Sequence, residues 1–105
     1  MEAYIKEATL TKKVKTHLSK LKSTFSWKCA DRYYSGLPDF IVCYRGRFLA
    51  IELKATGKKP RNLQRYVIQK IIDSGGVSFY ADSYEMYLKK FRKAVNDINK
   101  NDEAD

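Results

Sequence analysis

Two acidic residues and a lysine stand beside or within apolar stretches near the middle of the chain. Asp39 precedes the stretch FIVCY, and Glu52 and Lys54 fall within the stretch FLAIELK. A single acid in such a stretch usually marks the rim of a sheet. Two acids followed closely by a lysine instead favour a site for a hard divalent cation such as Mg²⁺ or Mn²⁺, because these ions prefer carboxylate oxygens and water.

A β-hairpin would bring these three residues together. The two apolar stretches are rich in β-branched and aromatic residues and flank Arg45-Gly46, which predicts a hairpin. If Arg45-Gly46 is a two-residue turn, Asp39 lies directly opposite Glu52, with Cβ atoms about 4.5–5.5 Å apart. Strand alternation then places Lys54 on the same face as Glu52. A divalent cation would offset the repulsion between the facing carboxylates. A shift of one residue in register would abolish the arrangement, so the prediction depends on the turn.

A cation held in this way suits one kind of chemistry. It can polarise a phosphodiester and lower the pKa of a bound water. A lysine beside the ion can orient or activate that water, or stabilise the charge that develops on the phosphorane. Asp39, Glu52 and Lys54 together therefore predict metal-assisted phosphodiester hydrolysis.

Periodicity along the chain predicts the elements that must position this site. These elements are, in order, a helix from about Tyr4 to Leu21, a strand over Phe25–Cys29, the hairpin strands Asp39–Tyr44 and Phe48–Lys54, a helix over Leu63–Ser74, a strand over Val77–Ala81 and a helix from about Ser83 to Ile98. The order predicts an α/β domain with a mixed central sheet flanked by helices. The length of 105 residues fits one domain, residues 1–105, with about 99–105 as a frayed acidic tail.

The charge balance points to a polyanionic partner. Twenty-one Lys and Arg against twelve Asp and Glu give a net charge of +9, which favours DNA, RNA or an anionic membrane as the partner. The apolar runs are too short to span a membrane, and no helix pattern combines a lysine face with a spare apolar face. The N-terminus also lacks the apolar segment of a secretory signal. We therefore expect an intracellular protein that binds nucleic acid and no membrane.

Two long stretches carry basic residues without any acid. From Ala8 to Ala30 there are six lysines, and a second acid-free stretch runs from Lys54 to Ile72. One interpretation is that both are solvated helix faces. The loop within the second stretch is more suggestive, because it follows Lys54 directly and would lie beside the scissile phosphate. The candidate DNA-binding residues are Lys28, Lys58, Lys59 and Arg61. His17 lies in a lysine-rich helical pattern and is expected to be solvated or to face the DNA.

The motifs in this region resemble those of a known family. Gly36-Leu37-Pro38-Asp39, Glu52-Leu53-Lys54 and the following Gln64 are similar to the G-x-P-D, E-x-K and glutamine motifs of the virus-type replication-repair nuclease (VRR-NUC) domain. This domain belongs to the PD-(D/E)XK nuclease superfamily. The resemblance runs from about Glu7 to Asp82. It implies a restriction-endonuclease-like core in which an N-terminal helix precedes a three-strand meander, then a helix, a strand and a last helix.

The resemblance also implies a role for each matching residue. Asp39 and Glu52 would bind the metal ion, with the backbone carbonyl of Leu53 as a third ligand. Lys54 would act on the nucleophilic water. Gln64 would help to organise the site.

A glutamate on the first helix commonly completes this set. Glu7 is the better match, because it precedes the apolar positions of that helix, and Glu2 is the alternative. Glu7 would then count among both the catalytic residues and the metal ligands. An equally good interpretation is an ordinary acid at the start of a helix, where the helix dipole favours negative charge.

These observations predict a structure-selective DNA endonuclease that uses Mg²⁺ or Mn²⁺. The resemblance to stand-alone virus-type nucleases implies cleavage of branched DNA, above all four-way (Holliday) junctions, in DNA replication, repair or recombination. It also implies a phage-encoded protein that acts in the cytoplasm of a bacterial host. The alternatives are a restriction-type, archaeal resolvase-type or non-selective nuclease with the same core, and a basic DNA-binding module whose acids are structural.

A homodimer is expected as well. One small domain holds one active site, whereas resolving a junction takes two symmetry-related cuts, which a two-fold dimer supplies. The stand-alone virus-type nucleases also look dimeric. The aromatic residues Phe25, Trp27, Tyr33 and Tyr34 exceed what a small core requires and are candidates for the interface or for stacking on DNA bases.

Overall fold

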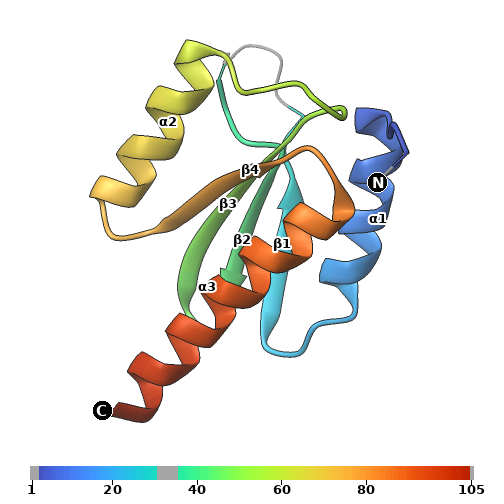
Figure 1. The fold of residues 1–105 in the computed structure, drawn as a ribbon. Coiled ribbons are helices and arrows are strands. Elements are labelled where there is room, and N and C mark those ends of the chain that lie inside the picture. Colours follow the sequence, from blue (N-terminus) through green and yellow to red (C-terminus); the bar gives the residue numbers. More distant parts are fainter. Residues whose placement is uncertain (1–2, 31–35, 105) are drawn as a thin grey trace.

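Seven helices and strands make up the part of the chain that the computed structural model describes, which is residues 3–30 and 36–104. In chain order they are α1 (Glu7–Ser19), β1 (Thr24–Lys28), β2 (Phe40–Tyr44), β3 (Arg47–Leu53), α2 (Asn62–Asp73), β4 (Val77–Ala81) and α3 (Tyr84–Ala104). Both the order and the type of the elements agree with the prediction from periodicity. The α/β class is therefore confirmed (Figure 1).

The four strands form one mixed sheet in the order β1-β2-β3-β4. The first three strands are antiparallel neighbours, and β4 runs parallel to β3 because α2 carries the chain back across the sheet. Helices α1 and α3 cover one face, and α2 lies against β3 and β4 on the other (Figure 1). None of the helices in the described ranges has the length and apolarity needed to cross a membrane.

The hairpin between β2 and β3 turns at Arg45-Gly46, as predicted. Both residues have positive φ angles, 49° and 81°, as in the mirror-image turns that match the right-handed twist of a hairpin. Tyr44 pairs with Arg47, and the ladder continues to the pair Phe40 and Ile51. The predicted register is thus confirmed. One residue farther from the turn on each strand, the same register places Asp39 opposite Glu52.

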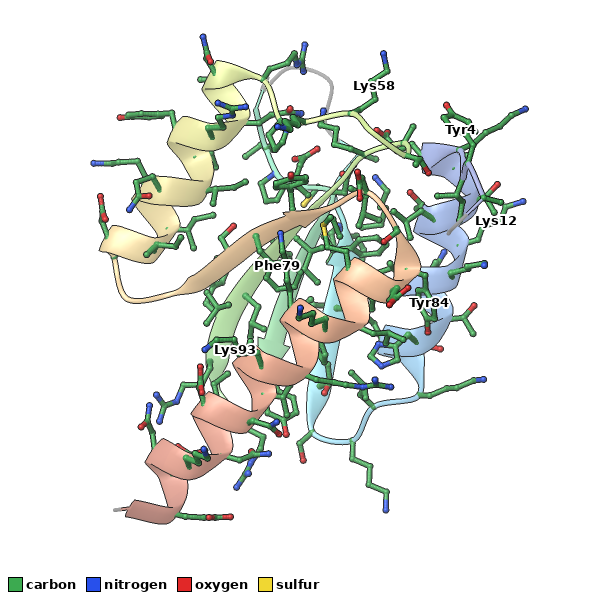
Figure 2. The ribbon with its side chains drawn as sticks, viewed as in Figure 1. Tyr4, Lys12, Lys58, Phe79, Tyr84 and Lys93 are labelled. Atoms are coloured by element: carbon green, nitrogen blue, oxygen red, sulfur yellow. The ribbon has the colours of Figure 1, made fainter. Side chains whose placement is uncertain are left out.

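His17 contributes to the contact between α1 and α3, although the sequence analysis placed it in solvent or against DNA. Its Nδ1 lies 2.7 Å from the hydroxyl oxygen of Tyr87, and its ring meets the rings of Tyr84, Tyr87 and Phe91 edge-on. Figure 2 shows Tyr84 on the side of α3 that faces α1. Burial, aided by the charge of Arg92, lowers the pKa of His17. The histidine is therefore a packed neutral group.

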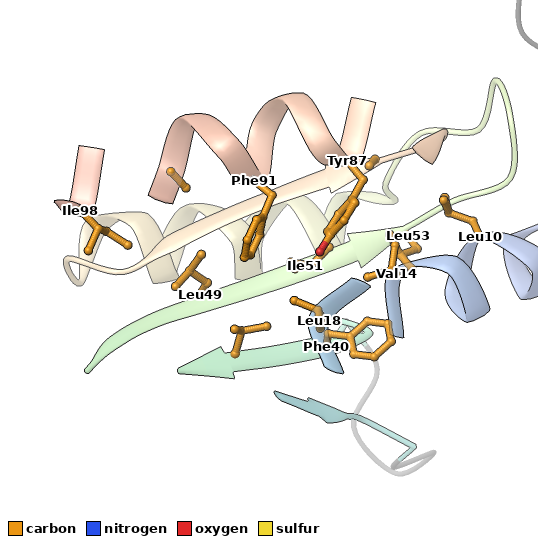
Figure 3. Close-up of a cluster of buried hydrophobic side chains, with 13 residues drawn as sticks. Leu10, Val14, Leu18, Phe40, Leu49, Ile51, Leu53, Tyr87, Phe91 and Ile98 are labelled. Carbon is orange, nitrogen blue, oxygen red and sulfur yellow. The ribbon is translucent and has the colours of Figure 1, made fainter. Parts of the chain in front are cut away.

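The hydrophobic core lies between the sheet and the pair α1 and α3 (Figure 3). From Leu49 on, every second residue of β3 enters it, because side chains alternate between the faces of a strand. The fully buried core side chains include Leu10, Val14, Leu49, Ile51, Leu53 and Tyr87. The intervening residue Glu52 points to the opposite face, so the strand at the centre of the core also carries the predicted metal ligand.

The C-terminal segment differs from the expected frayed tail, because α3 continues to Ala104. Two side chains of its last turns hold it against the hairpin turn. Arg45 donates a hydrogen bond to Asn99 at 2.6 Å, and Arg47 pairs with Asp102 at 2.6 Å. These contacts join residues more than fifty positions apart, and helical periodicity could not reveal them.

The turn that sets the register is open to a stability test. In Gly46→Ala the added Cβ meets no atom within 4 Å, so its cost is conformational. We expect a loss of about 1 kcal/mol in the free energy of unfolding, because an L-residue is disfavoured at positive φ. Gly46→Asn should lose less, since Asn tolerates this region better. Urea denaturation checks both, and an alanine variant as stable as the wild type would contradict the turn.

Candidate active site

Asp39 and Glu52 meet at the end of the hairpin that lies away from its turn. Asp39 stands one residue before β2, and Glu52 is the penultimate residue of β3. The Asp39 carboxylate accepts a hydrogen bond from the backbone N–H of Leu53 at 2.7 Å, which holds it against β3. The side chain of Glu52 is 5% exposed, so a carboxylate that is almost fully buried faces a second carboxylate.

The electrostatics of this pair are unfavourable without a cation. Burial, followed by the negative charge of Asp39 and a hydrogen bond to it, raises the pKa of Glu52 to about 8. Lys54 lowers that pKa, and Glu7 raises it further, but both effects are smaller. Without a metal ion the carboxyl pair therefore favours holding a proton. A divalent cation would take the place of this proton, because it favours the charged form of both carboxyl groups.

Gln64 is bound to the carboxylate of Glu52. Its side chain is buried, and its Nε2 donates a hydrogen bond to Glu52 Oε1 at 3.2 Å. Its Oε1 accepts a hydrogen bond from the backbone N–H of Arg61 at 2.8 Å, which is part of the capping box at the start of α2. The second bond fixes the amide orientation, so Gln64 presents its NH₂ group to the site.

A lysine stands beside each carboxylate. Lys54 Nζ lies 4.0 Å from Glu52 Oε1, on the face that the hairpin predicts. Lys28 Nζ lies 3.4 Å from Asp39 Oδ1 and also donates a hydrogen bond to the carbonyl of Cys29. From the sequence, Lys28 was predicted only to contact DNA. Its place in the site follows from the pairing of β1 with β2. The register of that pair could not be derived from the sequence, because residues 29–39 separate the two strands and no short turn fixes it.

Glu7 is the first residue of α1 and is exposed. The segment before α1 is tied to the loop after Lys54 by two hydrogen bonds, from Ile5 N–H to Thr56 Oγ1 at 2.7 Å and from Thr56 N–H to the carbonyl of Ile5 at 3.1 Å. The charge of Glu7 is therefore felt by Glu52. Thr56 was not predicted from the sequence, because nothing in its local pattern reveals that it bonds to Ile5, which is so distant along the chain.

The donor set fits a hard divalent cation. Across residues 3–30 and 36–104, no His, Cys or further acid joins Asp39 and Glu52 to make a cluster of three. Two carboxylates are sufficient for Mg²⁺, which commonly keeps several waters and binds one or two protein carboxylates. Glu7 therefore stays a predicted ligand, and Glu2, its alternative, lies outside the described residues.

Gly36 allows the chain to reach Asp39. Its φ is +87°, and a Cβ built on it would lie 2.7 Å from Cγ of Leu63 in α2. Only glycine combines this backbone conformation with such a close approach. The first residue of the G-L-P-D motif thus lets the loop before β2 pack against the start of α2, which carries Gln64.

Basic side chains border the site on the loop between β3 and α2. Lys58, Lys59 and Arg61 are exposed there. The loop leaves β3 directly after Lys54, and Figure 2 shows Lys58 extending from it into solvent. The structure therefore brings these predicted DNA contacts to the end of the sheet that holds the carboxylates. Among the ion pairs within residues 3–30 and 36–104, Lys28 is the one predicted DNA contact that pairs with a carboxylate.

Comparison with known proteins supports the same fold. The chain is similar to a solved structure described as "VRR_NUC domain", with a TM-score of 0.71 and 24% sequence identity over 82% of this chain and 94% of that chain. No family model and no curated protein matches the sequence. The resemblance that the motifs predicted is therefore confirmed at the level of the fold.

The raised pKa of Glu52 predicts a pH-dependent stability in the absence of metal. The folded protein holds a proton on Glu52 up to about pH 8, whereas the unfolded chain releases it near the ordinary value of 4.5. Stability must then fall as the pH rises between these values, because the folded state binds more protons. We expect Glu52→Gln to remove this fall. The loss of stability is measured by thermal melting in EDTA at pH 5.5 and 8.5. An equal pH dependence of the wild type and Glu52→Gln would contradict the raised pKa of Glu52.

Proposed function

We propose that this protein is a metal-dependent DNA endonuclease. The observation that carries the proposal is the buried Glu52 carboxyl facing Asp39, with the Lys54 ammonium 4.0 Å from Glu52. A structural role does not account for this pair, because burial and the facing Asp39 both penalise the charged form of Glu52. The fold, which is that of a VRR_NUC domain, supports a nuclease of the PD-(D/E)XK type.

The carboxyl groups of Asp39 and Glu52 would hold the ion, together with the backbone carbonyl of Leu53. Bound Mg²⁺ or Mn²⁺ supplies Lewis-acid polarisation of the phosphodiester and a lowered pKa of its water. The N–H of Leu53 keeps Asp39 in place, and Gln64 does the same for Glu52. Glu7, at the start of α1, would complete the ligand set.

Lys54 would act on the reacting groups directly. Its ammonium lies beside the carboxylate pair and is largely buried, so its charge is only weakly screened by solvent. From this position it orients the attacking water and stabilises the negative charge that develops on the phosphorane. Gln64 acts through Glu52 and is a positioning residue.

DNA is the substrate that the charge distribution favours. The net charge of +9 attracts a polyanion, and the exposed Lys58, Lys59 and Arg61 lie on the loop next to the carboxylates. We infer that this loop contacts the phosphates that flank the scissile bond. A non-catalytic DNA-binding module would use the same lysines but would have no use for the carboxylate pair.

Variants of the site test the proposal. Asp39→Asn and Glu52→Gln should each lower metal-dependent nicking of labelled DNA by more than a hundredfold, because each removes a metal ligand. Lys54→Ala should be similarly inactive and still bind DNA. Circular dichroism should show all three folded. Lys89→Ala on α3, an exposed lysine away from the site, is the control and should cut normally. Full cleavage by either carboxylate variant would overturn the metal assignment.

We further propose that the protein is a homodimer that cuts four-way junctions. The sheet face that carries Glu52 is uncovered over β1 and β2. Phe25 and Trp27 are each 61% exposed there, with stacked rings 6.4 Å apart. The register places Ile41, Cys43 and Phe48 beside them, so the patch carries no charge. A second copy of the chain fits such an apolar patch, and its two-fold symmetry matches that of a junction. Tyr33 and Tyr34, the other aromatic candidates for this interface, lie outside the described residues.

The dimer predicts both a mass and a cleavage pattern. Light scattering should give about twice the chain mass of 12.2 kDa, and Trp27→Glu, which puts a charge in the patch, should give the single-chain mass. Junctions should receive paired symmetric nicks, and linear duplex should be cut far less. A monomeric wild-type protein would contradict the dimer. Equal cutting of linear duplex would favour the restriction-type or non-selective alternative.

A further inference from the structure

A second basic surface lies on the solvent side of α1. We call it the α1 lysine face, formed by the exposed side chains of Lys12, Lys13, Lys15 and Lys20. From Ala8 to Ser19 the other exposed residues of the helix have short side chains, namely Ala8, Thr9, Thr16 and Ser19. Lysines with interspersed hydroxyl groups are typical of surfaces that contact a phosphate backbone.

The charge of the α1 lysine face is not neutralised by the rest of the described structure. No acid occurs between Ala8 and Ala30. The ion pairs found among residues 3–30 and 36–104 involve Lys28, Arg47, Lys54 and Lys93, and none of the four lysines of the face. An ordinary solvated helix mixes both signs of charge and gains from pairs three or four residues apart. No acid of the described residues therefore relieves the repulsion along this helix, and a bound anion would relieve it.

The face begins next to the candidate active site. The paired hydrogen bonds between Ile5 and Thr56 fix the start of α1 against the loop that follows Lys54. Figure 2 shows Lys58 of that loop and Tyr4 at the upper right of the molecule, with Lys12 below them on the right-hand side. From there α1 leads away from the carboxylates for 13 residues, or about 20 Å. Two basic surfaces thus start at the site and diverge from it.

We propose that the α1 lysine face is a second DNA-backbone contact, which holds the duplex on one side of the scissile phosphate. The loop with Lys58 and Lys59 then holds the other side. At a rise of about 3.4 Å per base pair, a helix about 20 Å long covers about six base pairs. This inference rests on the proposed function, and it adds where the DNA runs relative to the site.

An anionic membrane is a poorer partner for the same charges. Surface-binding amphipathic helices insert an apolar face into the lipid. The apolar side of α1 is instead fully used by the protein core, where Leu10 and Val14 are 0% exposed and Leu18 is 2% exposed. The helix therefore offers its partner only lysines and short polar groups.

The test compares two double variants that remove the same charge. Lys12→Gln with Lys15→Gln alters the centre of the α1 lysine face, and Lys89→Gln with Lys100→Gln alters exposed lysines of α3. DNA affinity is measured in EDTA over a range of salt concentrations, so that no cleavage occurs. The α1 variant should flatten the slope of log affinity against log salt by about 1.8, because each lost phosphate contact contributes about 0.9. The α3 variant should keep the wild-type slope, and equal slopes for both variants would overturn the proposal.

Duplex length supplies a second test. On DNA that extends fewer than about six base pairs from the cleavage position on one side, the α1 substitutions should lose their effect. The substitutions Lys58→Ala and Lys59→Ala should weaken binding to long and truncated DNA alike. An α1 effect that is independent of length, or stronger binding of the wild-type protein to phosphatidylserine vesicles than to duplex, would overturn the proposed path.

These outcomes are separable from those of the proposed function. The α1 double variant should keep the wild-type kcat at saturating DNA and raise KM, because the lysines bind DNA without touching the reacting groups. If Asp39→Asn abolishes cleavage while the α1 variant binds DNA like the wild type, the nuclease proposal stands and only the DNA contact of α1 is ruled out. If Asp39→Asn cleaves normally, the nuclease proposal fails, and the slopes still decide whether α1 contacts DNA.

Discussion

The repulsion between Asp39 and Glu52 is the constraint around which the rest of the site is arranged. The hairpin register forces the two carboxyl groups to face each other, and burial prevents water from screening them. Each neighbouring group reduces the resulting cost. Leu53 donates its N–H to Asp39, Gln64 donates to Glu52, and a lysine stands beside each acid. A site built in this way is poised for a cation and is unstable as a pair of bare charges.

The same strand connects this constraint to the stability of the fold. In β3, Ile51 and Leu53 lie in the core, and Glu52 between them points to the opposite face. The carboxylate therefore cannot relax by moving its strand, because that would expose two fully buried side chains at about 1.5–3 kcal/mol each. The cap of α2 fixes Gln64, and close packing at Gly36 fixes the loop before Asp39. Core packing thus supplies the rigidity that the repulsive pair requires.

Whether a structural feature could be predicted from the sequence depends on how far apart along the chain the interacting residues lie. The hairpin and the placement of Asp39, Glu52 and Lys54 were predictable, because one short turn sets their register. Contacts between distant elements were not. His17 meets Tyr87 across seventy positions, and the last turns of α3 are held by the hairpin turn. In each case a side chain whose local pattern suggested solvent is engaged by an element that periodicity cannot place.

The carboxyl pair of Asp39 and Glu52 is opposite in sign to the overall charge of the protein, and in the proposed function this opposition would link metal to DNA. A net charge of +9 disfavours the approach of a divalent cation, and the acid pair only partly offsets that field, since burial and mutual repulsion penalise the charged form of Glu52. DNA bound there would weaken this opposing field, because its phosphates would neutralise the surrounding lysines. A cation bound between the acids in turn reduces their repulsion toward the scissile phosphate. In the proposed function each ligand would therefore improve the site for the other, and by linkage the coupling would be equal in both directions.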